Sequence, residues 1–284
     1  MKIKANAKVN LSLDVTGKRT DGYHTLKSVF QSVSLCDYLT VNLFDNIKVA
    51  CSDSSICGED NLCFKAATLF FERSNIQSGA EIFIEKHIPL AGGLGGGSAD
   101  AAATLVALNT LCNNPLSQTE LLGIALELGA DVPFCMLGGT KLCEGIGEIM
   151  TDLKPLPDCF IVVAKRGQKS STGDMYRALD SDSNRKKVDT EGIINGLSNG
   201  DLVGALKGAY NCFESVCDPE DLNTVKAVAQ EYSAVYCGLS GAGPSVITVT
   251  ERETDAEKIA ETLKAKGFET FVAAPCKCGV EIIE

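Results

Sequence analysis

Polar and apolar residues alternate along residues 3–15 of this chain. Every odd-numbered position there is apolar, and every even-numbered position, including Asn6, Lys8 and Asn10, is polar. Because successive side chains of a β-strand point to opposite faces, the pattern predicts a long strand, or a bent pair of strands, with one buried face. Lys8 and Asn10 would project from the polar face, about 7 Å apart. On this pattern alone, Lys8 is better interpreted as a solvated lysine on a sheet surface.

Shorter strands and helices follow in the same half of the chain. Apolar and β-branched residues indicate strands at residues 24–33, 38–43, 47–51 and 81–85. The third of these is expected to pair with the second. Helical spacing of apolar residues predicts helices at residues 61–73, 98–109 and 117–128, and the last opens with a capping box, Ser117-Gln-Thr-Glu120. Residues 138–149 are expected to form a hairpin.

A second set of elements begins after Lys154-Pro-Leu-Pro-Asp158, whose two prolines favour a linker. Strands are predicted at residues 160–164, 235–239, 246–250 and 269–274. Helices are predicted at residues 172–179, 190–197, 202–208 and 256–266, and Asp218-Pro219 is expected to cap another. Helices do not alternate strictly with strands, which favours an α+β fold over a doubly wound sheet. The predicted domains are residues 1–153 and 154–284.

A glycine-rich stretch connects the predicted strand at 81–85 to the predicted helix at 98–109. It comprises Pro89, Leu90, Ala91, Gly92, Gly93, Leu94, Gly95, Gly96, Gly97, Ser98 and Ala99. Glycine lets the backbone come close to a bound group, and a helix N-terminus presents free N–H groups and the positive end of its dipole. We therefore predict a phosphate site here rather than a flexible turn without a ligand.

Two common phosphate motifs do not fit this loop. A Walker A loop ends in Gly-Lys-Ser/Thr, whereas this one ends Gly96-Gly97-Ser98 without a lysine. The dinucleotide fingerprint, counted from Gly93, requires glycine or alanine where Ser98 stands.

Asp131 lies in a turn that Gly129 and Pro133 make rigid. Two interpretations are open from the pattern: a cap for a helix at residues 132–136, or a functional carboxylate. A second glycine-rich turn, Ser240-Gly-Ala-Gly-Pro-Ser245, separates two of the predicted strands.

The composition narrows the class of protein. A formal net charge of −11 argues against nucleic acid as a partner. No apolar run approaches the roughly 20 residues that span a bilayer, and the N-terminus lacks a signal-peptide core, so we expect a cytoplasmic protein with no membrane partner. The thirteen cysteines form no Cys-x-x-Cys pair and only two histidines are present, so the common zinc patterns are absent. Reduced cysteines are favoured over disulfides or a metal site.

Three stretches together resemble the GHMP family of small-molecule kinases. They are residues 5–11, residues 89–102 and residues 240–245. The resemblance spans essentially the whole chain. It implies a two-domain α+β architecture with the active site in the cleft between the domains, ATP and Mg²⁺ as cofactors, and a small-molecule alcohol as the phosphoryl acceptor. A monomer or a homodimer is expected.

By this resemblance, Lys8 and Asp131 match the family's catalytic pair, which favours the functional interpretation of both residues. The chemistry of phosphoryl transfer agrees with that assignment. A hydroxyl that attacks the γ-phosphate of ATP needs a carboxylate to accept its proton and a cation to offset charge on the transferring group.

The nucleotide contacts follow from the same resemblance. The glycine loop matches the family's ATP loop, with Ser98 placed to present its hydroxyl to Mg²⁺. Asn61 and Lys86 fall where adenine is contacted. Ala91 and Ala99 stand where some members have glycine and serine, and Ala99 removes a hydroxyl contact to phosphate.

The stretch Arg19-Thr-Asp-Gly-Tyr-His24 resembles one branch of the family, whose alcohol substrate carries a cytidine diphosphate group. Tyr23, His24 and Tyr176 match positions that hold the cytosine ring. The remaining residues that match substrate contacts are Asn10, Gly241 and Gly243. Two alternatives are open: a GHMP kinase acting on homoserine, mevalonate or a sugar, and a ligand sensor that kept the fold and lost catalysis.

Overall fold

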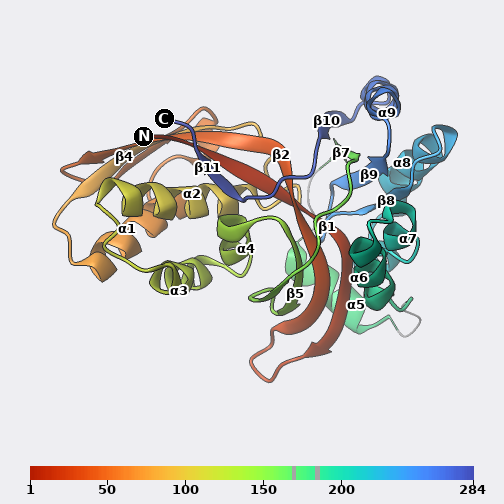
Figure 1. Cartoon of the computed structure of the whole chain (residues 1–284), viewed down its shortest axis with the longest axis horizontal. Coiled ribbons are helices and arrows are strands. Elements are labelled where there is room, and N and C mark those ends of the chain that lie inside the picture. The colour runs from red at the N-terminus through yellow and green to blue at the C-terminus, as the bar shows by residue number, and fades with distance from the viewer. Residues whose placement is uncertain (168–170, 183–185) are drawn as a thin grey trace.

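The computed structural model describes residues 1–167, 171–182 and 186–284. These residues form two sheets with their covering helices, arranged as two lobes (Figure 1). The two longest strands are β1 (Lys2–Lys18) and β2 (His24–Phe44). β1 starts in the N-terminal lobe and extends past its helices to the side of the C-terminal lobe, and β2 returns antiparallel to it. This long hairpin therefore carries residues from the core of one lobe to the boundary with the other.

The larger sheet has the strand order β11-β1-β2-β4-β3, and β5 and β6 extend it along another part of β2. Its remaining strands are β3 (Lys48–Cys51), β4 (Gly79–Glu85), β5 (Thr140–Gly145), β6 (Ile149–Asp152) and β11 (Val280–Ile282). The smaller sheet is antiparallel, with the order β10-β7-β9-β8. Its strands are β7 (Phe160–Lys165), β8 (Tyr236–Leu239), β9 (Val246–Thr250) and β10 (Glu269–Ala273).

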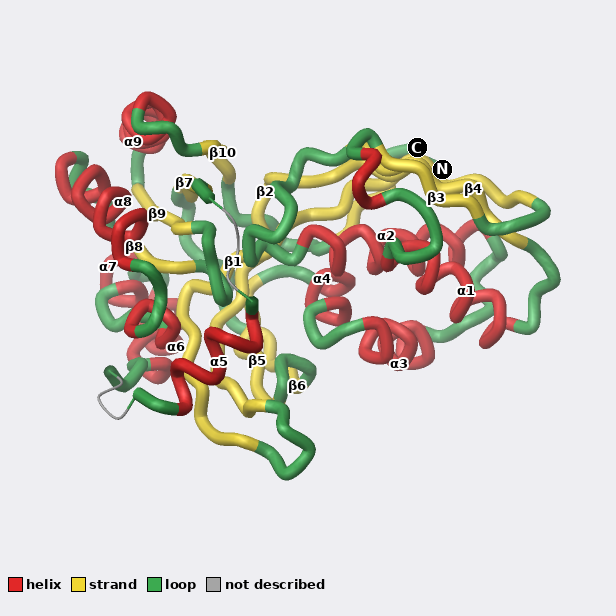
Figure 2. Tube along the Cα trace, turned by 180° about the vertical axis from the view of Figure 1, so that it is seen from behind, coloured by secondary structure: helices red, strands yellow, loops and turns green. Residues whose placement is uncertain are grey.

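The helices divide between the lobes in the same way (Figure 2). Those of the N-terminal lobe are η1 (Ser54–Ile56), α1 (Leu62–Ser74), α2 (Gly96–Leu111), α3 (Gln118–Leu128) and α4 (Val132–Leu137). Those of the C-terminal lobe are α5 (Thr172–Asp180), α6 (Thr190–Asn199), α7 (Leu202–Leu206), η2 (Cys212–Ser215), α8 (Pro219–Glu231) and α9 (Glu253–Ala265). The capping box of α3 and the Asp218 cap of α8 form as the sequence predicts.

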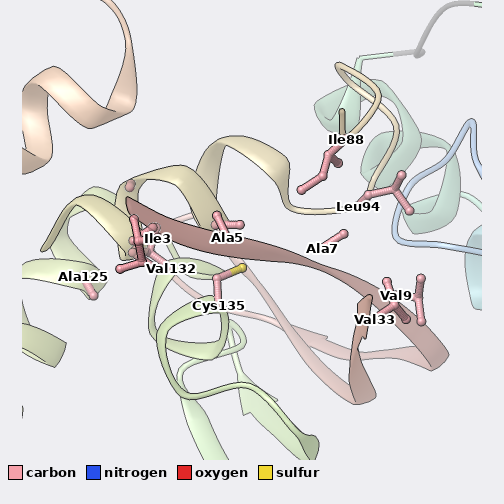
Figure 3. Packing of buried hydrophobic residues seen from close by; sticks show 14 of the residues in the cluster. Ile3, Ala5, Ala7, Val9, Val33, Ile88, Leu94, Ala125, Val132 and Cys135 are labelled. Carbon is pink, nitrogen blue, oxygen red and sulfur yellow. The ribbon is translucent and has the colours of Figure 1, made fainter. Parts of the chain in front are cut away.

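The main core lies between the larger sheet and the helices on its inner face. Figure 3 shows Ile3, Ala5, Ala7 and Val9 in a row along β1. Because Ala5 and Ala7 have small side chains, the backbone of the glycine loop can come close to β1. The Lys8 N–H donates to the Leu94 carbonyl at 2.9 Å. The apolar half of the alternating pattern therefore both builds the core and brings the glycine loop against β1.

The prediction that β1 has only one buried face is wrong in its central part. Asn6, Lys8, Asn10 and Ser12 are buried as well. The glycine loop and the turn at residues 240–245 cover this face, since Leu94 bonds to the Lys8 backbone and Ser240 Oγ accepts from the Asn10 N–H. Lys8 is accordingly 4% exposed, and its interpretation as a solvated surface lysine is wrong.

Strand pairing differs from the prediction at three places. The strands predicted at residues 24–33 and 38–43 are one continuous strand, because β1 pairs with both parts across an irregularity between Asn6 and Lys8. β3 pairs in parallel with β4 rather than with residues 38–43. The closing strand β11 was not predicted, and it pairs with β1.

The chain ends beside its beginning, on the edge of the larger sheet (Figure 1). A division between residues 153 and 154 therefore separates the two lobes with one exception. β11 follows residue 154 in the chain but belongs to the larger sheet of the N-terminal lobe. The domain boundary itself stays a prediction. No helix within the described ranges is long and apolar enough to cross a membrane.

Candidate active site

A cavity of about 970 Å³ lies between the two lobes. β1, β2 and the glycine loop line one side, and α5, η2 and the second glycine turn line the other. Most residues predicted for the site line it, namely Lys8, Asn10, Tyr23, His24, Lys86, Pro89, Leu90, Ala91, Gly92, Gly93, Leu94, Gly95, Gly96, Gly97, Ser98, Asp131, Tyr176 and Gly241. Within the described part of the chain, three do not line it: Asn61, Ala99 and Gly243.

Lys8 and Asp131 meet at the floor of this cavity. Lys8 Nζ lies 3.4 Å from Asp131 Oδ2 and donates to Asn10 Oδ1 at 2.9 Å. The Asn10 amide is held in that orientation because its Nδ2 donates to Ser28 Oγ at 2.9 Å. The ammonium group also lies 4.7 Å from the centroid of the Phe30 ring. A buried ammonium group needs such partners, and here they fix it beside the carboxylate.

Asp131 occupies the N-cap position of α4 but does not act as the cap. Its side chain makes no capping hydrogen bond within the part of the chain that the structure describes. The carboxylate instead faces Lys8 and the cavity. Of the two interpretations open from the sequence, the capping role is wrong.

The glycine loop packs tightly against its surroundings except at one residue. The helix starts at Gly96, two residues before the predicted start, and Gly93 and Gly95 have the left-handed φ values of 77° and 71°. A Cβ built at Gly93 would lie 2.4 Å from the Ser240 carbonyl oxygen, and one at Gly95 would lie 2.9 Å from Lys8 Cγ. At Gly97, by contrast, no described heavy atom lies within 4 Å of the added Cβ. Gly97 is therefore open toward a ligand.

The second glycine turn joins the lobes at the same place. Ser240 Oγ donates to the Gly93 carbonyl at 3.2 Å, and the Ser245 N–H donates to the Gly92 carbonyl at 3.3 Å. Buried Asn211 supports this turn through Nδ2, which donates to the carbonyls of Leu239 and Gly241 at 2.8 Å each. Asn211 was not predicted, because it lies far from both turns along the chain.

An aromatic group forms the far end of the cavity. The His24 and Tyr176 rings are stacked with centroids 4.5 Å apart, and Phe213 packs edge-on against Tyr176 at 5.0 Å. Burial raises the pKa of Tyr176 to about 12, so its phenol is neutral at neutral pH. Tyr23 lies at the rim and is 63% exposed. Phe213 was not predicted.

Asp180 orients the histidine of this group. His24 Nε2 lies 2.7 Å from Asp180 Oδ1, and Lys18 Nζ lies 2.6 Å from Asp180 Oδ2. Hydrogen bonds from Lys18 and His24 hold the pKa of Asp180 below its usual value. Neither Asp180 nor Lys18 was predicted, since their partners come together only in the folded chain.

The two residues predicted to contact adenine have other partners in the structure. Asn61 is the N-cap of α1, where Oδ1 accepts from the Cys63 N–H at 2.8 Å and Nδ2 donates to the Ile56 carbonyl at 2.6 Å. Lys86 Nζ lies 2.6 Å from both Asp37 Oδ2 and Asp100 Oδ2. Their contact with adenine stays a prediction.

The side chains at the cavity are compatible with Mg²⁺ bound together with a nucleotide. No group of three or more His, Cys, Asp or Glu residues that could hold a metal occurs among the described residues. Mg²⁺ commonly uses one or two carboxylates with substrate phosphates and water, rather than a cage made entirely of protein. Asp131 and Ser98 both line the cavity and supply a carboxylate and a hydroxyl.

A cavity that offers helix N–H groups for phosphate and a carboxylate beside an ammonium group is suited to phosphoryl transfer. The class of protein is an ATP-dependent small-molecule kinase. The chain belongs to the GHMP kinase family. The model for the GHMP kinases N terminal domain matches residues 61–139, and the model for GHMP kinases C terminal matches residues 194–269.

Relatives within the family are similar over nearly the full chain. A 4-diphosphocytidyl-2-C-methyl-D-erythritol kinase of Clostridium acetobutylicum is 38% identical over 276 residues, which cover 96% of this chain and 99% of that protein. The crystal structure of a 4-(cytidine 5'-diphospho)-2C-methyl-D-erythritol kinase has a TM-score of 0.82 at 32% identity, with 97% and 99% of the two chains covered. A homoserine kinase from Cytophaga hutchinsonii has a TM-score of 0.77 over 100% and 97% of the chains, and at 22% identity it shows the fold alone.

Proposed function

We propose that this chain transfers the γ-phosphate of ATP to the C2 hydroxyl of 4-diphosphocytidyl-2-C-methyl-D-erythritol, giving the 2-phosphate, in the non-mevalonate route to isoprenoid precursors. The observation that carries the proposal is the Lys8–Asp131 pair at the floor of a cavity bordered by the glycine loop. The names of the full-length relatives support the choice of alcohol.

In the proposed reaction, the substrate hydroxyl lies beside Asp131 and the γ-phosphate lies beside Lys8. The hydroxyl oxygen forms the new bond to phosphorus, its proton passes to the Asp131 carboxylate, and the bond from phosphorus to the bridging oxygen breaks to release ADP. Lys8 and the N–H groups at the start of α2 offset negative charge on the transferring group. Asn10 keeps the ammonium group in place through its hydrogen bond to Lys8 Nζ.

Mg²⁺ would be held by Ser98 together with the phosphates of ATP, and Asp131 would stay available to accept the proton. Bound there, Mg²⁺ would neutralise part of the charge of the phosphates. Because the chain carries a net charge of −11, a polyanionic nucleotide requires such local compensation.

The aromatic group supports a cytidine-bearing substrate over the other alcohols. A pyrimidine has a flat face for stacking and one hydrogen-bonding edge, and stacking on an aromatic side chain contributes about 1–3 kcal/mol per base. We propose that the cytosine ring lies against the group formed by Tyr23, His24 and Tyr176, with backbone groups near His24 at its edge. Gly241, which also lines the cavity, would lie near the remainder of the substrate.

The alternatives are weaker on specific grounds. Homoserine kinase shares the fold, so the fold alone does not choose the acceptor, but a small amino acid would leave the aromatic end of the cavity unused. A sensor without catalysis would not need an ammonium group buried beside a carboxylate. We propose that the chain acts on small molecules as a monomer or a homodimer. Its expected compartment is the cytoplasm.

The proposal is tested by identifying the product. The chain is incubated with ATP, Mg²⁺ and 4-diphosphocytidyl-2-C-methyl-D-erythritol, and phosphorus NMR follows the reaction. A new phosphate monoester on the C2 oxygen, formed in equal amount with ADP, is expected. ADP formation without that ester, or no reaction in a folded protein, would contradict the proposal.

A further inference from the structure

Beneath the glycine loop lies a buried cluster of three charged residues that the proposed reaction does not use. Lys86 Nζ contacts Asp37 Oδ2 and Asp100 Oδ2, each at 2.6 Å. The side chains of Lys86, Asp37 and Asp100 are 6%, 0% and 3% exposed. Burying three ionisable groups is costly unless their partners are fixed, so the cluster needs a reason beyond surface solvation.

The three residues come from the two ends of the glycine loop and from the sheet behind it. Lys86 directly follows β4 and enters the loop, Asp100 lies in the second turn of α2 where the loop has ended, and Asp37 belongs to β2. Asp37 Oδ1 also accepts the backbone N–H groups of His87 and Ile88 at 2.6 and 2.8 Å. One carboxylate therefore holds the entry to the loop at three points.

Lys86 extends this constraint to the phosphate-binding end of the loop. A Cβ built at Gly96 would lie 3.1 Å from Lys86 Nζ, so the ammonium group lies directly under the first turn of α2. Lys86 also lines the cavity. We propose that Asp37 is a positioning residue for the nucleotide: through Lys86 and the backbone at residues 87 and 88, it fixes the glycine loop in the conformation that binds the phosphates of ATP. This inference rests on the proposed ATP site.

The two carboxyl groups have different roles in the cluster. Asp37 accepts three N–H donors, whereas Asp100 Oδ1 is buried and has no hydrogen-bond partner within the described ranges. Asp37 therefore holds both the Lys86 ammonium group and the backbone at residues 87 and 88, whereas the hydrogen bond that Asp100 accepts comes from Lys86.

Two amide substitutions separate the roles. Asp37→Asn places an N–H₂ group against the Lys86 ammonium group or the backbone N–H groups, so the glycine loop loses part of what holds it. The dissociation constant for ATP at pH 7, measured by calorimetry, should therefore rise at least about tenfold, which is equivalent to about 1.4 kcal/mol. Asp100→Asn changes a contact of Lys86 but leaves the bonds from Asp37 to the backbone of His87 and Ile88 in place, so its ATP affinity should stay within about threefold of the wild type. Glu281→Gln, which removes an exposed partner of Lys4, is the matched control and should leave ATP affinity unchanged.

Comparing stability with ATP affinity gives a readout that a purely structural role would not reproduce. Both substitutions change a carboxylate contact of Lys86 and should lower the melting temperature, but only Asp37→Asn should weaken ATP binding at least about tenfold. A folded Asp37→Asn variant with wild-type ATP affinity would overturn the inference. An Asp100→Asn variant with ATP affinity at least about tenfold below the wild type would also overturn it, even if Asp37→Asn does not fold. Wild-type protein that binds no ATP at all would instead contradict the proposed kinase.

Discussion

At the scale of single residues, Lys8 shows how neighbouring groups hold a buried ammonium group in a fixed position. An isolated ammonium group in a core would be strongly destabilising, but Asn10, Asp131 and the Phe30 ring surround this one. Truncating one partner of such a group leaves the other uncompensated. Substitution of either Lys8 or Asp131 is therefore expected to lower the catalytic rate strongly, although the two charged groups lie 3.4 Å apart and not at the shortest ion-pair distance.

Asp131→Asn tests the proton-accepting role. The amide keeps the shape of the side chain but cannot accept the proton, so kcat should fall by roughly 10²-fold or more while ATP affinity is largely kept. Asp201→Asn is a suitable control, because Asp201 caps α7 through the Gly204 N–H and asparagine caps helices equally well. Near-native kcat in Asp131→Asn would rule out its role as the base.

Asp100 predicts how stability depends on pH. In the unfolded chain its carboxyl ionises near the ordinary pKa of about 3.9, whereas in the folded protein burial raises the pKa to about 8. Between these values the folded state binds one more proton, so this group lowers the free energy of unfolding as the pH rises. Asp100→Asn should therefore reduce the fall in melting temperature between about pH 5 and pH 8. An unchanged slope would contradict the assignment of the proton to Asp100.

At the scale of elements, the glycine loop and α2 act as one unit. The loop is pinned by Asp37 at its entry, by the Leu94 bond to β1 in its middle and by the Ser240 bond to Gly93 from the other lobe. Gly93 and Gly95 are required by left-handed φ values and close backbone contacts. Gly97 meets neither requirement in the described structure, and it lines the cavity, as the proposed phosphate site requires.

Gly97→Val distinguishes ligand binding from folding. A Cβ at Gly97 has no described heavy atom within 4 Å outside its chain neighbours and the backbone of its own helix, so the fold should stay cooperative. The valine side chain would occupy the space that we assign to phosphate. ATP affinity measured by calorimetry should fall at least about tenfold. Gly123→Val in α3 is the matched control, since a Cβ at Gly123 also has no described neighbour within 4 Å. ATP affinity of Gly97→Val equal to that of the control would exclude the phosphate site.

Local patterns predicted most elements but not how strands pair. The capping box of α3, the Asp218 cap of α8 and the alternation of β1 are local signals, and all three appear in the structure. The continuity of β2, the parallel pairing of β3 and the addition of β11 depend on partners distant in the chain. Such pairing leaves no periodic signal in the strand itself.

The same limit applies to the candidate site. The glycine loop was predicted because its anion chemistry lies within one stretch of sequence. The pairing of Lys8 with Asp131 was predicted through resemblance to a family, since periodicity favoured a surface lysine. Asp37, Asn211 and Asp180 were missed because each acts on residues far away in the chain.

At the scale of the whole molecule, the cavity depends on both lobes. The N-terminal lobe provides the glycine loop and the Lys8–Asp131 pair, and α5 and η2 of the C-terminal lobe provide Tyr176 and Phe213. The β1–β2 hairpin runs between the lobes, with Lys8 inside β1 and His24 at the start of β2. The proposed phosphate site therefore lies on the N-terminal lobe, whereas the proposed cytidine pocket is built from both the hairpin and the C-terminal lobe.

The thirteen cysteines give a test of the whole chain. All of them lie within the described ranges, and none forms a disulfide. Thiol titration of protein unfolded without reductant should count all thirteen as free, whereas in the native protein exposed Cys57 should react first. A lower count that is restored by adding reductant would contradict the free-thiol structure and the expected cytoplasmic compartment.

The cytidine pocket predicts discrimination between bases. Uracil replaces a donor with an acceptor at C4, which would leave a group at the cytosine edge unpaired. The uridine analogue of the substrate should therefore have a kcat/KM at least about tenfold lower. Tyr176→Ala should weaken both substrates by removing the stacking surface. Equal use of the two analogues would contradict the pocket while leaving the kinase intact.

The most direct test of the central claim compares kcat/KM for different alcohols under one set of conditions. Purified protein with ATP and Mg²⁺ is assayed for ADP release with 4-diphosphocytidyl-2-C-methyl-D-erythritol, homoserine and mevalonate in turn. The account predicts phosphorylation of the cytidine-bearing alcohol with a kcat/KM at least about 10³-fold above that of either other alcohol, because neither of them reaches the aromatic end of the cavity. Homoserine or mevalonate phosphorylated as efficiently as the cytidine-bearing alcohol would contradict it.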